Sequence, residues 1–333
     1  GTLNTQSSGT DRGLTVTGDV SVTGTLTGNA SAISMGSLTI ADGGTVTAPS
    51  SSGSLTLTKD DTSQFLYETI SGATFNNSDG TVIITGDGKL KPRAGTGNFH
   101  NLTINASGNT IDQSIALTCE GNLTITAGTL DTDSSNNYAL TVTGELSCAG
   151  TFTGNASLVT VRNLLVTAGT FTAPSDSGSG DLIITGEGNS GTGDGYAFRR
   201  SGGTFTHSSG TVTFTDNTLV QVRMNGVGSG QKFNNVILNE VSAGLIVQTN
   251  DEGFYCEGDL TLTAGDFDLT SSAALLTVEG DVSIANGNTL GSISSQQYRD
   301  NTFGSLTIAD GGTYSATSGT TTITSHASNW TLK

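Results

Sequence analysis

The sequence has few charged and few aromatic residues, and it has no long apolar segment. Charged residues make up 12% of the 333 positions and aromatic residues 6%. No apolar run approaches the roughly 20 residues that a membrane-spanning helix needs. No window places apolar residues at the spacing of an amphipathic helix. These absences argue against a helical bundle and against a membrane-spanning helix.

Positive charge is also scarce. The chain has 12 Lys and Arg against 29 Asp and Glu, which gives a formal net charge of −17. Such a surface repels phosphate backbones and anionic lipid headgroups. We therefore expect neither nucleic acid nor a membrane as a partner.

The sequence is rich in glycine and in short apolar triplets separated by threonine. Glycine occurs 47 times, and phrases such as LTVTG recur. Because successive side chains of a strand point to opposite faces, Leu14 and Val16 are predicted to enter the core while Thr15 and Thr17 face water. The pattern predicts short strands joined by glycine turns, and hence an all-β fold.

Three segments repeat one another along the chain. They are LTVTGDVSVTGTLTGNAS from Leu14, LTVTGELSCAGTFTGNAS from Leu140 and LTVEGDVSIANGNTLGS from Leu276. The offsets are 126 (140 − 14) and 136 (276 − 140) residues. We interpret the chain as one elongated unit, residues 1–333, with super-repeats at 14–139 and 140–275 and a partial third at 276–333.

One decapeptide, GSLTIADGGT, occurs unchanged at Gly36 and at Gly304. In the middle copy its place is taken by NLLVTAGT, which keeps the apolar alternation and a glycine but lacks the aspartate. A binding site present in two copies would need that aspartate, whereas a turn does not. We predict that Leu38, Ile40, Leu306 and Ile308 point inward and that the Asp-Gly-Gly segments are turns.

A finer period of about 20 residues lies inside each super-repeat. Leu102, Leu123, Leu146 and Leu164 are separated by 21, 23 and 18 residues. A period of this length with two or three short strands is typical of a solenoid in which each coil buries its neighbour. We predict a right-handed parallel β-solenoid (β-helix) of about 15 coils, with irregular coils at 59–70 and 186–200. At about 4.8 Å per coil it would be a rod on the order of 70 Å long.

Phrases of the types GDLTVTGTL, GNLTITAGTLD and FxNLTI recur along the chain. With these phrases the sequence resembles the β-strand-repeat proteins found among bacterial surface adhesins, autotransporter-like passengers and phage fibre or virion surface proteins. The resemblance covers nearly the whole chain, and its phrases encode a coil rather than an activity. It implies an extracellular location, on a virion or cell surface, and a structural or adhesive role.

The cysteines and histidines are predicted to be structural. Cys148 stands where Val22 and Ile284 stand in the other copies, so it occupies a core position. Cys119 and Cys256 are counterparts that lie several coils apart, too far for a disulfide. The histidines are not kept between the copies. We expect no metal site and no cofactor, with adventitious calcium as the one open alternative on so acidic a surface.

Carboxylates and aromatic residues offer the main alternative to a purely structural role. Parallel solenoids place side chains of neighbouring coils side by side, so acidic residues from different coils can form a catalytic pair. Two irregular segments combine acids with aromatics, and they supply the candidate contacts with a glycan or a partner: Tyr67, Glu187, Asp194, Tyr196, Arg199 and Arg200. The alternative interpretation is that both segments are wide coils with solvated charges.

Outward Thr-x-Thr pairs suggest one further possibility. Regular rows of such pairs on a flat face can order water and bind ice. Here the pairs are expected at irregular spacings along the chain, with charged residues between them. We therefore interpret them as β-branched polar residues suited to exposed strands.

Taken together, the sequence favours a non-enzymatic structural or adhesive component of an extracellular assembly, such as a phage fibre, a virion decoration or a surface filament. Self-association as a trimer or filament, or contact with neighbouring assembly proteins, is expected at the open ends of the solenoid. The alternative is a glycan-binding or polysaccharide-degrading β-helix, which should show a groove where acids from adjacent coils converge with aromatics.

Overall fold

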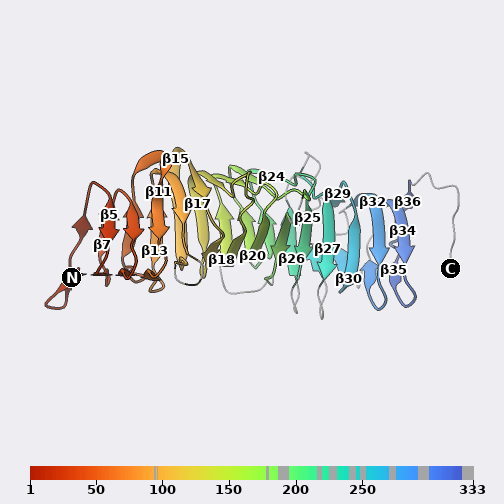
Figure 1. Cartoon of the computed structure of the whole chain (residues 1–333). Helices are drawn as coiled ribbons and strands as arrows, with labels where there is room; N and C mark the ends of the chain where they lie inside the picture. Colours follow the sequence, from red (N-terminus) through yellow and green to blue (C-terminus); the bar gives the residue numbers. More distant parts are fainter. Residues whose placement is uncertain are drawn as a thin grey trace.

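The strands stack along one axis into an elongated rod (Figure 1). The computed structural model describes residues 1–93, 95, 97–177, 180–186, 195–215, 220–224, 231–239, 245–247, 253–269, 275–291 and 300–324. Every regular element in these ranges is a strand, so none of them forms a helix of the length and apolarity that crossing a membrane requires. The fold is an all-β parallel solenoid of about 12 turns. The predicted fold class is confirmed, whereas the predicted number of about 15 coils is not.

Hydrogen-bonded columns of parallel strands, here called ladders, run along the rod. The first ladder extends over nearly its whole described length. Its strands are β4 (Leu14–Thr15), β7 (Ala32–Met35), β10 (Ser54–Leu57), β13 (Thr81–Ile84), β15 (Asn101–Gln113), β17 (Leu123–Asp131), β18 (Leu140–Cys148), β20 (Leu158–Val166), β23 (Phe198–Arg200), β26 (Val220–Met224), β28 (Leu245–Val247), β31 (Phe267–Leu269), β33 (Thr289–Gly291) and β35 (Thr313–Ser315).

Two further ladders accompany the first from the N-terminal end. The second ladder consists of β5 (Val20–Val22), β8 (Leu38–Ile40), β11 (Asp60–Thr69), β14 (Asp87–Lys91), the second halves of β15 and β17, β19 (Thr151–Thr153), β21 (Thr170–Thr172) and β24 (Thr204–Thr206). The third ladder consists of β1 (Thr2–Asn4), β6 (Thr25–Thr27), β9 (Thr45–Thr47) and β12 (Thr74–Asn76). The strands β2 (Gln6–Ser7) and β3 (Thr10–Asp11) form a separate antiparallel pair.

Later along the chain, two new ladders replace these. The fourth ladder begins at Phe99 and contains β16 (Leu117–Cys119), the first halves of β18 and β20, β22 (Asp181–Ile184), β25 (Thr211–Phe214), β27 (Asn235–Asn239), β30 (Leu260–Ala264) and the second halves of β32 (Leu276–Ile284) and β34 (Asn301–Ile308). The fifth ladder begins at Phe233 and contains β29 (Phe254–Cys256), the first halves of β32 and β34, and β36 (Thr321–Ile323).

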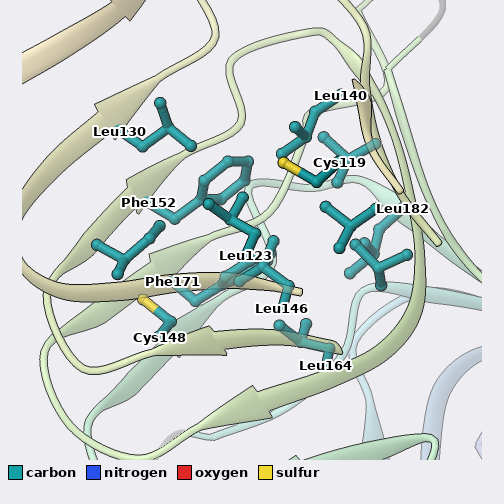
Figure 2. Close-up of a cluster of buried hydrophobic side chains, with 14 of the residues drawn as sticks. Cys119, Leu123, Leu130, Leu140, Leu146, Cys148, Phe152, Leu164, Phe171 and Leu182 are labelled. Carbon is teal, nitrogen blue, oxygen red and sulfur yellow. The ribbon is translucent and has the colours of Figure 1, made fainter. Parts of the chain in front are cut away.

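Identical inward positions stack on one another and form the core. In the first ladder Leu102 pairs with Leu123, and Leu123 pairs with Leu146. All three side chains are fully buried. Figure 2 shows this stacking in the middle of the rod, where leucines and phenylalanines from successive turns fill the interior. Each turn therefore excludes water from its neighbours, as the sequence period predicts.

Aromatic clusters fill the interior where one ladder gives way to another. The ring of Tyr67 lies 5.3 Å from Phe75 and 4.7 Å from Phe99, at the point where the third ladder ends and the fourth begins. Further along the rod, Phe198 lies 5.2 Å from Phe205 and 5.1 Å from Phe233, where the second ladder ends and the fifth begins. The two clusters lie in segments that match in sequence.

The cysteines are core residues, as predicted. Cys119, Cys148 and Cys256 are free thiols, and all three are buried. Figure 2 shows Cys119 and Cys148 among leucine and phenylalanine side chains. Burial raises the pKa of each thiol, to about 12 for Cys148.

The repeated decapeptide forms the same turn twice but is not equally buried. Gly44 donates a backbone hydrogen bond to Ala41, and Gly312 donates the equivalent bond to Ala309. Leu38 and Ile40 are fully buried, as predicted. Leu306 and Ile308 are in register with the buried Val282 and Ile284, so they lie at inward positions as predicted, but Leu306 is only partly buried and Ile308 is 43% exposed. Among the described residues no strand covers this half of β34, whereas β11 covers β8.

One of the two irregular coils can be assessed. Strand β11 pairs with β14 through two register shifts, one between Asp60 and Phe65 and one between Phe65 and Tyr67. The irregularity expected at 59–70 is therefore present as a bulged strand. Most of the second segment, 187–194, lies outside the described residues.

Candidate functional site

The six residues singled out from the sequence do not form one site. Glu187 and Asp194 lie outside the described residues. Tyr67 is fully buried, and its hydroxyl donates to the carbonyl of Gly97 at 3.2 Å. Burial raises the pKa of this phenol. Tyr67 is therefore part of the core and is not available for contact with a glycan.

Tyr196 and Arg199 do lie together, with a third residue that the sequence did not single out. The guanidinium carbon of Arg199 lies 5.7 Å from the centre of the Tyr196 ring, and that of Arg223 lies 6.0 Å from it. Arg199 and Arg223 are register partners on β23 and β26. The sequence feature that could have identified Arg223 is its outward position in the alternating phrase VQVRM. The result is a half-buried basic and aromatic patch on an acidic rod.

Arg200 has a different role from its neighbour. Its guanidinium donates through Nε to the carbonyl of Gly203 at 3.0 Å. It therefore holds the turn that precedes β24. Asn163 donates to the carbonyl of Tyr196 at 2.7 Å and so fixes the backbone at the tyrosine.

Carboxylates bridge the two places where ladders change. Glu120 accepts from Asn77 at 2.8 Å and from Asn98 at 3.1 Å, and these bonds from Asn98 and Asn77 lower its pKa. In the matching segment Glu257 pairs with Lys232 and, at 2.8 Å, with His207. The bond from Lys232 is the largest cause of the lowered pKa of Glu257. Each carboxylate thus ties together chain segments on both sides of a junction.

Two aspartates are stacked on the outer face of the second ladder. Asp112 and Asp131 are register partners on β15 and β17. Burial, and next the charge of Asp131, raise the pKa of Asp112. Asp131 accepts from Asn155 at 2.7 Å and from the backbone of Asp133 at 2.7 Å. The register thus places two carboxylates on neighbouring strands of one face. Within the described ranges no three His, Cys, Asp or Glu side chains are grouped to hold a metal ion.

The outward threonine pairs are irregularly spaced along the chain, as expected, but the register of the strands aligns some of them into regular arrays. In the third ladder Thr25 is in register with Thr45, and Thr27 with Thr47. The second ladder holds a like array, in which two columns run through these strands: Thr129, Thr151, Thr170, Thr204; and Asp131, Thr153, Thr172, Thr206. The spacing is irregular along the chain only because the turns between the strands differ in length.

A polar groove with a volume of about 380 Å³ lies beside the second array. The described residues that line it have small side chains without charge: Ser134, Asn137, Thr153, Asn155, Ala156, Thr172, Ser175, Ser177 and Ser208. Asn155 has a left-handed backbone (φ 49°) and donates to Asp131. The hydroxyls of Thr153, Thr172 and Ser208 make no side-chain hydrogen bond within the described part of the chain. They are therefore available to a ligand.

The same groove residues recur in the first array. Seven lining residues have an identical counterpart there, in these pairs: Thr27 and Thr153, Asn29 and Asn155, Ala30 and Ala156, Thr47 and Thr172, Ser50 and Ser175, Ser52 and Ser177, Ser78 and Ser208. The backbone repeats as well. Ser50 donates to Asn29 at 2.6 Å, and Ser175 donates to Asn155 at 2.7 Å. Asn29 has the same left-handed φ of 49°.

Comparison with known proteins identifies no relative: no family model, no curated protein and no solved structure matches this chain.

Proposed function

We propose that the protein is a non-enzymatic structural and adhesive rod of an extracellular assembly, at a virion or cell surface. One observation carries the proposal. The first ladder joins strands from Leu14 to Ser315, and the leucines at its inward positions are buried in turn after turn of its middle part: Leu55, Leu102, Leu123, Leu146 and Leu164. Such a column resists local opening, because each strand must lose two neighbours at once. The proposed role of the rod is to give the assembly length and stiffness.

The organisation of the chain into super-repeats is part of the same proposal. Super-repeats at 14–139 and 140–275, with a partial third, would let the rod lengthen by adding a unit whose residues already fit one another. The two aromatic clusters and the two bridged junctions support this plan, because both lie at matching points of consecutive units.

Self-association through the ends of the rod, as a filament or trimer, is part of the proposal. At the first turn Leu3 is 53% exposed, and Leu14, Val16 and Val20 are only partly buried. These residues line an apolar hollow of about 430 Å³. Exposed apolar surface next to unpaired strand edges favours association with another strand-bearing surface.

Solution scattering and electron microscopy of the purified chain test the proposal. We expect an elongated particle, and longer particles as the concentration rises. A compact particle would contradict the rod. Particles that stay monomeric at high concentration would contradict the self-association.

A polysaccharide-degrading function is the second candidate, and Asp112 with Asp131 is the observation that favours it. The pair lies beside the polar groove, since Asp131 accepts from Asn155 of its lining. Release of reducing ends from a polysaccharide, lost in Asp112→Asn and in Asp131→Asn, would replace the non-enzymatic proposal.

A further inference from the structure

We propose that the polar groove beside the second threonine array, and the surface formed by the matching residues beside the first array, are seats for an uncharged glycan chain. The inference rests on the adhesive part of the proposed function and names its ligand class. One seat is the described groove at Thr153, Thr172 and Ser208. The other is formed by their counterparts Thr27, Thr47 and Ser78.

The lining has the chemistry that recognises sugar hydroxyls. Hydroxyl groups donate and accept hydrogen bonds at once, and so do primary amides between them. The groove presents both kinds of group from four neighbouring turns, over about 10–15 Å at the spacing of parallel strands. A short stretch of an oligosaccharide chain fits that length. Rigid strands hold the groups in place, so little ordering is lost on binding.

The surrounding charges favour a neutral ligand over an acidic one. Asp131 lies at one end of the described groove, where it accepts from Asn155. Asp176 lies between two lining serines and accepts from Thr211 at 3.3 Å. Carboxylates placed at the rim repel uronic acids, sialic acids and sulfated sugars. Among the described residues that line the groove, none is a lysine, an arginine or a histidine.

Structural need explains only part of the identity between the lining of the groove and the matching residues beside the first array. Asn29 and Asn155 adopt left-handed turns and donate to the preceding coil, so folding alone accounts for them. Ser52 and Ser177 are exposed, and the outward threonines face solvent beside the groove. A neighbouring position that is exposed in both copies differs between them, with Ser51 in the first and Asp176 in the second.

The two seats belong to different ladders, the third and the second. A rod with seats on two ladders can hold separate glycan chains, or two points of one surface, at the same time. Two weak sites on a rigid body then give a much higher apparent affinity for a polymer than one site does.

Affinity electrophoresis of the whole chain tests the proposal. The native gels contain dextran, mannan or galactan as neutral probes, or alginate as the acidic probe. Thr172→Tyr fills the described groove, and Thr47→Tyr fills its counterpart. Tyrosine suits an exposed strand position, so both variants should fold. Thr160→Tyr, at an outward position of the fourth ladder, is the matched control.

We expect at least one neutral probe to retard the wild-type protein and the Thr160→Tyr control. Each groove variant should be retarded less, and the double variant should lose retardation. No retardation by any neutral probe, retardation by alginate alone, or unchanged retardation of the double variant would each overturn the inference. Scattering on the same samples reports the rod shape, so a failure of the glycan seats is distinguished from a failure of the proposed structural role.

Discussion

The ring of Phe99 lies 6.1 Å from the ring of Phe75, across the point where the third ladder ends and the fourth begins. In the matching segment the ring of Phe233 lies 5.5 Å from that of Phe205. Packed aromatic rings thus fill the core at both places where one ladder ends and another begins.

The aromatic clusters should carry much of the stability at these junctions. Phe99→Ala and Phe233→Ala each remove a fully buried ring, and we expect a loss of about 3–5 kcal/mol in the free energy of unfolding. Urea unfolding measures the loss, and hydrogen exchange locates it. Faster exchange confined to the mutated junction is expected, because turns stabilise their nearest neighbours. Equal exchange along the whole rod would contradict this.

Two equivalent glycines should not tolerate a side chain. A Cβ at Gly80 would meet the carbonyl oxygen of Pro49, and one at Gly210 would meet that of Pro174. We expect Gly80→Ala and Gly210→Ala to cost about 1–3 kcal/mol each. Gly18→Ala is the control, because a Cβ there has open space. If Gly18→Ala lowered the melting temperature as much as the other two variants do, the steric explanation would be refuted.

The carboxylate at the second junction should make stability depend on pH. The folded pKa of Glu257 is lowered, first by Lys232, so its contribution is present above its ordinary value of 4.5 and is lost as pH falls through the folded value. The melting temperature of the wild type should therefore exceed that of Glu257→Gln at pH 7, and the difference should shrink below about pH 4.5. A difference that grows on acidification would have the wrong sign. Glu120→Gln should behave alike.

The thiols should react only after unfolding. Cys119 and Cys256 are fully buried, and burial raises the pKa of all three cysteines, so little thiolate is present at neutral pH. We expect a thiol reagent to label none of the three rapidly in buffer and all of them in urea. Reducing agent should leave the melting temperature unchanged. Rapid labelling of a single cysteine in buffer would place that residue at the surface.

The threonine arrays should not bind ice. The first array is bounded by Asn4 and Asn76, and the second begins with Asp131, so neither extends beyond four strands. We expect purified protein to give no thermal hysteresis and no shaping of ice crystals. Faceted ice crystals in the presence of the protein would contradict this prediction and would identify the arrays as an ice-binding face.

Much of the fold could be predicted from local patterns. The alternation of apolar and polar residues identified inward residues such as Leu38 and Ile40, which are buried, whereas Leu14 and Val16 at the first turn are only partly buried. Comparison of the internal copies identified Cys148 as a core position. The copies also indicated that Asp42-Gly43-Gly44 is a turn, and Gly43 has a positive φ of 71°. Each inference depends only on a strand period of two or on turn chemistry, which a short segment carries by itself.

The candidate site was harder to predict, because it depends on which turns become neighbours. Tyr67 looked like a surface aromatic in an acidic segment, yet bulges in β11 turn it into the core. Arg223 joins Tyr196 only through the register of β23 with β26. The polar groove combines residues from Ser134 to Ser208, and no local motif marks it.

The sequence by itself determined that the chain is a parallel solenoid with an apolar interior, because its alternation and its period are written into every coil. Tertiary structure decided where ladders end and begin, which threonines stand in register and where a groove opens. Those features arise from the lengths of the turns between strands. A turn longer by a few residues leaves the local pattern unchanged but alters which side chains meet across neighbouring turns.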